Sequence, residues 1–466
     1  MEGVGGMVRV FRHHIPVGTV VQLSADALVL FGALLVAVLI QHAPYGAAVP
    51  EAVGPAAVFA AVALAVNATF GMYRRDETAT FGITVGRLLI AVALAAPIAY
   101  FVFGLMPRGE NLQGVVGYAV LYTLAGLILV RQAAFTLRRT DVGARRVLIV
   151  GTGEEAVGVE EQLRSIGHPK FRVVGFFAAD GGQPQGSAIR VFDQTSSIRN
   201  LVRQHRIDEV IVAVREQRGG VLPLRELLEC RISGVPILDL AGFYERVRGE
   251  VPVESLKASW LIYGQGFDQD RLRMFVKRAF DLSASLVLLS LALPVMLLTA
   301  LLIKLESPGP VFYRQERIGR GGRSFDVIKF RSMRVDAETD GVARWAQAKD
   351  PRVTRVGSFI RKMRIDELPQ LLNVLRGDMS LVGPRPERPV FVDQLKSQIR
   401  FYDIRHSVKP GVTGWAQVRY SYGASVEDAV RKLQFDLYYV KNHSLFLDLL
   451  ILVETVRVVL FREGAH

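Results

Sequence analysis

The chain has 466 residues, of which half are hydrophobic, and a formal net charge of +13 at pH 7. Its one cysteine, Cys230, excludes an internal disulfide framework and a cysteine-rich zinc site, and its histidines form no HExxH-type cluster. The positive charge fits an anionic membrane surface or phosphorylated substrates, whereas no nucleic-acid motif with interleaved aromatic residues is present. A bound metal would therefore be a hard ion on carboxylates.

Four apolar runs near the start of the chain are close to the roughly 20 residues that span a bilayer. Basic residues flank the runs on alternate sides, which by the positive-inside rule places both ends of this region in the cytoplasm. No removable signal peptide is expected. We interpret Asp26, inside the first run, as structural, although an intramembrane charge can also be functional. Residues 1–140 thus predict a four-helix transmembrane bundle with spans near Val17–Ile40, Ala52–Phe70, Leu88–Met106 and Leu112–Val130.

A middle region then alternates strands and helices, with strands expected at Arg145–Val150, Phe171–Phe177 and Glu209–Val214. This alternation is typical of a parallel sheet, so we predict a Rossmann-like α/β cytoplasmic domain over residues 141–262. The Gly151-Thr-Gly153 turn suggests dinucleotide binding. Two glutamates follow it directly, however, where their carboxylates would oppose a pyrophosphate. A structural or nucleotide-sensing role is favoured.

A second apolar stretch, between Phe275 and Leu305, has basic residues at both ends and Pro294 near its middle. Proline kinks or interrupts a helix, and a helix from Asp281 to Leu293 would cover only about 20 Å of a hydrocarbon core about 30 Å thick. We therefore expect a re-entrant membrane hairpin over about residues 275–304. The alternative, a fifth span with a proline kink, would place the following charged region outside the cell.

The densest charge pattern lies just before a long apolar helical run. Three cations in four residues, from Arg361 to Arg364, precede an adjacent acid pair, Asp366 and Glu367. Asp366 suits a helix N-cap, with Pro369 in the first turn, so the acids would lie at the positive end of a helix dipole. Acids, clustered cations and a divalent metal are components of phosphoryl transfer. The alternative is a capped surface helix with solvated charges.

Longer motifs surround the acid pair, at residues 307–333, 350–357, 383–389 and 409–418. From about Arg273 to its end, the chain resembles the bacterial polyprenyl-phosphate glycosyl-1-phosphate transferases. These are the monotopic phosphoglycosyl transferases that start exopolysaccharide and O-antigen synthesis. The four spans and the Rossmann-like region resemble the large members of that family. The resemblance implies a mainly α-helical, monotopic catalytic domain over residues 271–466.

The resemblance also implies a two-step reaction on the cytoplasmic side of the bacterial inner membrane. A UDP-sugar, with glucose or galactose as the first expectation, gives its sugar-1-phosphate to undecaprenyl phosphate and releases UMP. Asp366 is carried over as the nucleophile that forms an aspartyl-phosphosugar intermediate. Glu367 is carried over as its partner in a Mg²⁺ (or Mn²⁺) site. A homodimer through the middle domain is implied as well.

Basic residues near the pair are candidate phosphate ligands. Arg385 and Arg388 lie in a proline-stiffened loop and suit fork-like binding of a diphosphate. Arg361 and Arg364 lie within a turn of Asp366 and could hold the lipid phosphate.

Three further candidates have structural alternatives. Lys329 and Arg331 lie on a predicted strand that matches a family motif and is expected to line the site. Arg317 and Arg331 could instead pair with Glu316 or Asp326, or with lipid headgroups. Gln417, together with Trp415, could cover the uridine or only brace its loop.

Two helical features remain open. Small members of the family often have Ser directly before the hairpin proline, where this chain has Leu293; Ser290 could instead help the break by bonding to a carbonyl of the preceding turn. The run Ser444–Phe461 predicts either an interfacial amphipathic helix or a packed core helix.

Two other classes of function compete with the transferase. One is a membrane-anchored sugar-nucleotide dehydratase or oxidoreductase, which would need a Tyr-x-x-x-Lys motif; no tyrosine here has a lysine four residues later. The other is a non-catalytic scaffold for polysaccharide assembly, which the intact acid pair disfavours.

Overall fold

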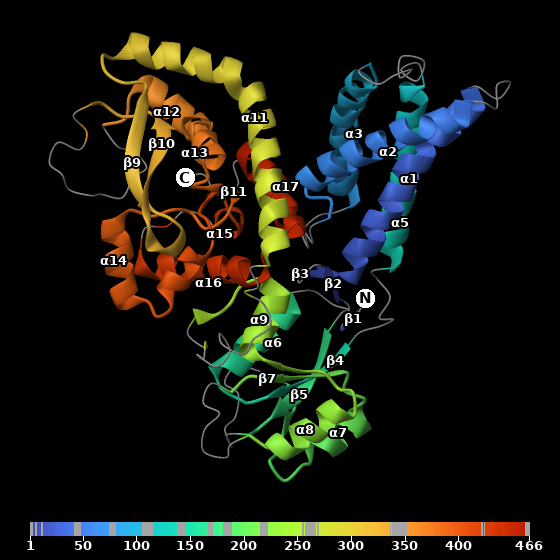
Figure 1. Cartoon of the computed structure of the whole chain (residues 1–466). Coiled ribbons are helices and arrows are strands. Elements are labelled where there is room, and N and C mark those ends of the chain that lie inside the picture. Colours follow the sequence, from blue (N-terminus) through green and yellow to red (C-terminus); the bar gives the residue numbers. More distant parts are fainter. Residues whose placement is uncertain are drawn as a thin grey trace. The chain divides into compact units, whose positions relative to one another are not determined.

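The computed structural model describes the chain in segments (Figure 1). Short strands β1 (Gly3–Val4), β2 (Met7–Val10) and β3 (His13–Pro16) begin it. Apart from a few residues near its start, the chain divides between Phe243 and Tyr244 into two compact units, which are treated separately. The described residues are 3–4, 7–10, 13–41, 48–73, 81–104, 115–137, 145–165, 171–179, 189–214, 222–253, 256, 267, 270–335, 337, 352–420, 423 and 425–461.

The described residues of the first unit form four long apolar helices: α1 (Val17–Gln41), α2 (Ala48–Thr69), α3 (Phe81–Gly104) and α5 (Val116–Leu137). All four are long and apolar enough to cross a membrane. They share a core in which Leu30, Phe59, Leu88 and Leu127 are buried. The four predicted apolar helices are confirmed, with the third starting earlier and the fourth ending later than expected. Their insertion as a transmembrane bundle stays a prediction.

Asp26 makes a buried polar cluster between two of these helices. Its carboxylate accepts hydrogen bonds of 2.9 and 2.6 Å from the guanidinium of Arg131 on α5, and one of 2.9 Å from the Tyr73 hydroxyl. Asp26 is fully buried and Arg131 is 5% exposed. These contacts agree with a structural role for Asp26, as the sequence suggested.

Replacing Asp26 by leucine is expected to lower the thermal unfolding temperature of the detergent-solubilised protein. The change leaves the Arg131 guanidinium buried without its counter-ion, a loss on the order of 3–5 kcal/mol. The double variant Asp26→Leu/Arg131→Met removes both charges and should recover most of the stability. Equal unfolding temperatures for wild type and Asp26→Leu would contradict this role.

The first unit also holds a parallel sheet with strand order β6-β5-β4-β7-β8. Buried apolar strands β4 and β7 lie at its centre, as expected for a sheet covered on both faces. The predicted parallel α/β pattern is therefore present, with β7 ending at Val212. The strands are β4 (Arg145–Val150), β5 (Phe171–Phe177), β6 (Val191–Phe192), β7 (Glu209–Val212) and β8 (Ile237–Asp239); the helices are α6 (Glu154–Ser165), α7 (Ile198–His205) and α8 (Leu224–Ile232).

The second unit starts at Tyr244, within α9 (Leu240–Arg248). The segment that follows α9 packs into this unit's core: Val251 is buried there, and the Trp415 indole donates a 2.7 Å hydrogen bond to the Gly249 carbonyl. Gly249 and Val251, which lie within the range 141–262 that we predicted for the middle domain, thus pack in the second unit. The sequence around Gly249 and Val251 has no helix or strand periodicity from which this packing could have been predicted.

Where the structure describes it, the second unit is mainly helical, with two small sheets. Strands β9 (Phe312–Ile318) and β10 (Ser324–Phe330) pair antiparallel, and β11 (Ser380–Val382) and β12 (Gly411–Thr413) pair parallel. The helices are α11 (Arg271–Glu306), α12 (Arg355–Lys362), α13 (Gln370–Arg376), α14 (Pro389–Gln398), α15 (Trp415–Arg419), α16 (Val426–Asn442) and α17 (Leu445–Phe461), with 3-10 turns η2 (Arg320–Gly322), η3 (Ile365–Glu367) and η4 (Tyr402–Ser407).

Helix α17 shows the packing that one of the two alternatives predicted. Its Leu447, Asp448 and Ile451 are buried, and Asp448 accepts hydrogen bonds from Lys277 (2.7 Å) and the Tyr439 hydroxyl (2.8 Å). Apolar side chains near its end, among them Val456 and Leu460, are exposed. One face is therefore packed, and contact of the exposed face with lipid stays a prediction.

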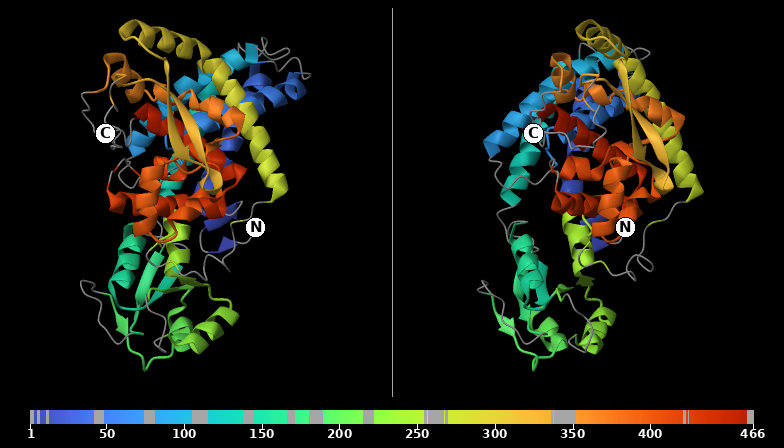
Figure 2. Two further views of the ribbon diagram at one scale, coloured as in Figure 1. Left: turned by 60° about the vertical axis from the view of Figure 1, so that its left-hand side comes forward. Right: turned by 90° about the vertical axis from the view of Figure 1, so that its left-hand side faces the viewer.

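Helix α11 is a single 36-residue helix with a sharp bend (Figures 1 and 2) and with Pro294 inside it. As expected, the Ser290 hydroxyl donates a 2.9 Å hydrogen bond to the Leu286 carbonyl in the preceding turn. Leucines on both sides of the proline, including Leu291 and Leu297, are exposed. The predicted proline break thus takes the form of a bend in a continuous helix.

Candidate active site

The acid pair lies in the 3-10 turn η3, between α12 and α13. Arg364 precedes the turn with a left-handed backbone (φ 57°), which reverses the chain after α12. The N-cap of α13 is Pro369, so our expectation that Asp366 caps this helix was wrong. The proline fits the entry to the helix and starts it too late for Asp366 to cap it.

Glu367 is held by three cations that converge on its Oε1 atom. Lys329 Nζ lies 3.2 Å away, Arg385 Nη2 3.1 Å and Arg364 Nη1 3.6 Å. Burial opposes ionisation of this carboxyl, but the three cations outweigh it and keep its pKa well below the usual range. Glu367 is therefore a fixed negative centre at which basic side chains from three segments meet.

Asp366 contrasts with its neighbour. It is 8% exposed, and within the described part of the chain its carboxylate makes no hydrogen bond or ion pair. Burial and the charge of Glu367 raise its pKa, against the opposing charges of Lys329, Arg361 and Arg364. A carboxylate that makes no hydrogen bond or ion pair among the described residues is available to act as a nucleophile.

Lys329 reaches the pair because strand β10 is fastened to α13. The Asn373 side chain accepts a 3.0 Å hydrogen bond from the Ile328 amide and donates one of 2.7 Å to the Asp326 carbonyl. Asn373 is fully buried. Its amide thus takes the place of a neighbouring strand on the free edge of β10. We had not assigned Asn373 a role, and no sequence signal marks it.

Arg385 extends from a loop whose backbone is fixed from several directions. Prolines on either side give no amide hydrogen, so the loop cannot be held by a regular ladder. Instead, each of its four consecutive carbonyls accepts a hydrogen bond from another element. The donors are Gly411 N to Pro384 O (3.0 Å), Arg405 Nη2 to Arg385 O (3.0 Å), Arg317 Nη1 to Pro386 O (3.2 Å) and Ile318 N to Glu387 O (2.9 Å).

Several predicted site residues brace the backbone instead of meeting the acid pair. Arg317 binds the Pro386 carbonyl and pairs with Glu387 at 3.5 Å. Arg331 donates to the carbonyls of Ser307 (2.8 Å) and Pro308 (3.0 Å), at the end of α11. The alternative partners that we named, Glu316 and Asp326, are not the ones used.

The remaining candidates, Arg361, Arg388 and Gln417, differ in how they relate to the acid pair. Arg361 is close enough to Asp366 to favour its ionised form. Arg388 is half-buried at the N-cap of α14. The Gln417 amide nitrogen donates to the Val412 carbonyl at 3.3 Å, while its oxygen is buried without a partner among the described residues. This contact fits the bracing alternative, and cover of the uridine by Gln417 stays a prediction.

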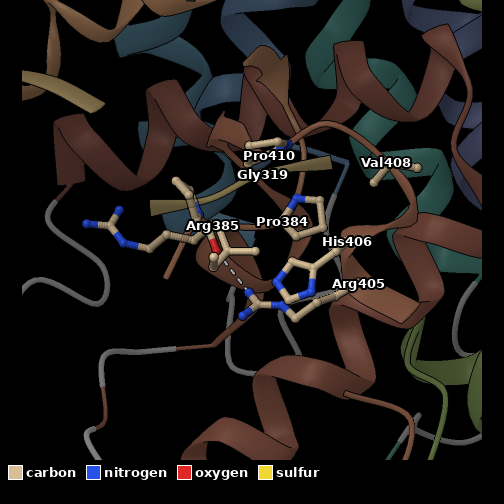
Figure 3. Close-up of a pocket in the computed structure, with 9 residues that line it drawn as sticks. Gly319, Pro384, Arg385, Arg405, His406, Val408 and Pro410 are labelled. Carbon is tan, nitrogen blue, oxygen red and sulfur yellow. Dashed lines mark hydrogen bonds between the residues drawn. The ribbon is translucent and has the colours of Figure 1, made fainter. Parts of the chain in front are cut away.

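A small pocket lies behind the Arg385 loop, lined by Pro384, His406, Val408 and Pro410 among others (Figure 3). The Arg385 side chain points away from it. Burial and the neighbouring Arg405 lower the pKa of His406 to about 4, so its imidazole is neutral at physiological pH. The pocket and the acid pair thus share Arg385, whose side chain meets Glu367 and points away from the pocket.

Stability should fall on acidification because of His406. Its pKa of about 4 in the folded chain lies below the ordinary value of 6.5. The neutral ring therefore contributes stability above about pH 6.5, and this is lost as the pH falls towards 4. The difference amounts to roughly 3 kcal/mol. His406→Gln should show a shallower loss of thermal stability between pH 6.5 and 4 than wild type; parallel curves would refute the assignment.

The acid pair suits a hard divalent cation. Mg²⁺ takes oxygen ligands and commonly uses one or two carboxylates together with substrate phosphates. Asp366 has a free carboxylate, and Glu367 stays ionised beside it. The described residues hold no larger group of three or more potential ligands, so any metal here would need substrate oxygens as well.

Comparisons with known proteins place the chain in a family. A family described as bacterial sugar transferase matches residues 272–462, and one described as CoA-binding domain matches residues 68–221. The chain is 45% identical over 56% of its length to a UDP-N-acetylgalactosamine-undecaprenyl-phosphate N-acetylgalactosaminephosphotransferase of Aeromonas hydrophila, and spans 61% of that protein. It is 45% identical to a UDP-glucose:undecaprenyl-phosphate glucose-1-phosphate transferase of Escherichia coli (72% of each chain), and 32% identical to one of Xanthomonas campestris (75% of each).

The glycine turn of the middle region does not fit the phosphates of CoA. Gly151 has φ +117°, and a Cβ there would lie 2.8 Å from the Ala213 carbonyl oxygen, so this glycine serves close packing of strand ends. The first turn of α6 carries Glu154 and Glu155, whose carboxylates would repel an anionic ligand. This turn offers a structural reason for Gly151 and an electrostatic obstacle to CoA.

Proposed function

Because the chain belongs to the bacterial sugar transferase family, a family of transferases, we propose that it transfers a sugar-1-phosphate from a UDP-sugar to undecaprenyl phosphate. The observation that carries this proposal is the acid pair, in which Asp366 is unpaired and buried while Glu367 is fixed by three cations. The activities for which the relatives are named supply the substrate classes.

In the proposed reaction, an Asp366 oxygen attacks the phosphorus that bears the sugar. The bond from this phosphorus to UMP breaks, UMP leaves with the electron pair, and an aspartyl-phosphosugar remains. A phosphate oxygen of undecaprenyl phosphate then attacks the same phosphorus. The products are undecaprenyl-diphosphate-sugar and a regenerated carboxylate. Two displacements replace one difficult step.

The cations around the pair would position and neutralise the phosphates. Arg385 and Arg388 suit the diphosphate of the donor, and Lys329 adds charge from β10. Arg361 and Arg364, on the other side of Asp366, suit the phosphate of the lipid. A Mg²⁺ held by Asp366 and Glu367 with substrate oxygens would stabilise the charge that develops on the leaving UMP.

We further propose that α11 enters and leaves the cytoplasmic leaflet of the inner membrane. Its two ends meet the same compact body: Arg278 donates to the Val374 carbonyl (2.6 Å), while Ile303 packs in a cluster with Phe330 and Ile360. A straight span would separate these ends by the hydrocarbon core. The shared packing therefore supports the re-entrant arrangement over a fifth span, with the four apolar helices as a separate anchor.

The test is UMP release from a panel of UDP-sugars by the detergent-purified full chain with undecaprenyl phosphate and Mg²⁺. UDP-glucose and UDP-galactose are the proposed donors, and UDP-N-acetylgalactosamine belongs in the panel because of the Aeromonas relative. Release with one donor, abolished by EDTA, would support the proposal. No UMP from any donor, with folded protein and lipid present, would overturn it in favour of a scaffold or an oxidoreductase.

We propose that the chain acts as a homodimer through α8. Leu224, Leu228 and Ile232 form an exposed stripe at four-residue spacing, with exposed fractions of 68, 57 and 77%. In an antiparallel pair about a two-fold axis, Leu228 would meet its own copy, and Arg225 would lie beside the partner's Glu229. This self-complementary charge favours a second copy as the occupant.

Replacing Leu228 by glutamate should convert the dimer to a monomer, because it places like charges at the two-fold axis. Light scattering of the detergent-solubilised protein measures the mass. The matched control is Val390→Glu, a similarly exposed site (62%) on α14, which should leave the mass unchanged. A monomeric wild type, or a dimeric Leu228→Glu, would contradict this interface.

A further inference from the structure

Arg405 is a buried arginine without an assigned role in the reaction. It lies in η4 and is 5% exposed. Asp436, on α16, faces it at 2.8 Å from Nη2 and 3.1 Å from Nε. Its Nη1 donates a 2.6 Å hydrogen bond to the Tyr402 hydroxyl. The guanidinium is thus occupied on most of its edges and cannot itself reach a substrate.

The remaining hydrogen bond of Arg405 goes to the Arg385 loop. Its Nη2 donates to the Arg385 carbonyl oxygen at 3.0 Å, as Figure 3 shows. On the other side of the same residue, the Arg385 side chain points away from Arg405 and reaches Glu367 at 3.1 Å. Arg385 is therefore held at both ends. Arg405, which is paired with Asp436, binds its backbone carbonyl, and Glu367 binds its guanidinium.

The hydrogen bond to the Arg385 carbonyl can set the orientation of the Arg385 backbone, and with it the direction of the side chain. Pro384 and Pro386 donate no amide hydrogen, and the proline that follows restricts Arg385 to extended backbone conformations. Rotation of the peptide between Arg385 and Pro386 is then controlled by the donor to the Arg385 carbonyl. The adjacent carbonyls have their own donors, Gly411 N and Arg317, so the loop itself can stay folded without Arg405.

We propose that Arg405, held in place by Asp436, is a positioning residue that aims Arg385 at the acid pair and the donor diphosphate. This inference rests on the proposed transferase function. Arg405 acts only through Arg385, because its own nitrogen atoms are occupied by Asp436, Tyr402 and the loop. Its removal should therefore weaken donor binding and turnover by misplacing Arg385, without removing a group that touches the phosphates.

The test uses Arg405→Lys and Asp436→Asn in the full chain. Lysine keeps a cation beside Asp436 but cannot hold both the carboxylate and the loop. Loss of a hydrogen bond from a charged group corresponds to roughly 10- to 100-fold in an equilibrium. We expect a loss of that size in kcat/KM for the UDP-sugar, and a similar weakening of UDP binding by calorimetry. Tyr402→Phe, which leaves the Arg385 contact intact, should stay within about threefold of wild type.

A double-mutant cycle separates positioning from general stability. If Arg405 acts through Arg385, adding Arg405→Lys to Arg385→Gln should cost less than about threefold further in UDP affinity. The inference would be overturned if the double variant lost UDP affinity by the full product of the two single losses, or if Arg405→Lys bound UDP as wild type does. Either result would leave the transferase function standing. If Arg405→Lys does not fold, Asp436→Asn in the same cycle decides in the same way. Absence of UMP release by the wild type would refute the transferase function itself. The UDP affinities of the variants would still test whether Arg405 positions Arg385.

Discussion

Replacing Asp366 by asparagine is expected to lower UMP release at least about 10⁴-fold, because the variant has no carboxylate to attack the donor phosphorus. Folding should be unaffected. The Asp366 carboxylate makes no hydrogen bond or ion pair in the described part of the chain, so asparagine removes only a buried charge that the surroundings disfavour. Initial rates of UMP release with saturating donor and lipid measure the effect.

The control for this substitution is Asp378→Asn, which changes an exposed acid just after α13 and should keep wild-type rates. A second measurement follows the intermediate. Wild type incubated with a sugar-labelled donor and no lipid should retain covalent label, whereas Asp366→Asn should retain none. Label retained by the variant, or near-normal turnover, would assign the nucleophile to another residue.

The sequence was most informative where its signals are local. The apolar helices α1, α2, α3 and α5 and the alternating strands of the middle region follow from hydrophobic runs that depend little on tertiary contacts. The bend in α11 follows from Pro294 and the hydroxyl of Ser290. Our prediction that Asp366 is the N-cap of α13 was wrong because the helix begins only after Pro369, three residues later, which takes the N-cap position itself.

The supports of the site could not be predicted, since they depend on contacts between distant segments. Asn373 fastens β10 from 45 residues away, and Arg405 fixes the Arg385 carbonyl from 20 residues away. Among many arginines, sequence alone also cannot separate those that meet the acid pair from those that brace carbonyls. Arg385 does the first, whereas Arg317 and Arg331 do the second, although all three lie in motifs of similar character.

Replacing Arg385 by glutamine is expected to lower kcat/KM for the UDP-sugar by about 10²- to 10³-fold, the usual effect of removing one charged donor from a developing anionic centre. The effect should not come from a change in Glu367. Lys329 and Arg364 remain at 3.2 and 3.6 Å from its Oε1 atom and keep this carboxyl ionised. The kcat/KM of Arg385→Lys should lie between those of wild type and Arg385→Gln, because an ammonium group keeps the charge but cannot form the two parallel hydrogen bonds by which a guanidinium binds phosphate.

Arg376→Gln is the matched control, since Arg376 is an exposed arginine at the end of α13 and should tolerate the change within about threefold. Measuring KM and kcat separately shows where Arg385 acts. A rise in KM alone would indicate contact with the bound diphosphate only, and an additional fall in kcat would show that the contact strengthens as UMP leaves. Wild-type kinetics for Arg385→Gln would mean that its contact with Glu367 is structural, and would leave Arg388 and Lys329 as the phosphate-binding cations of the site.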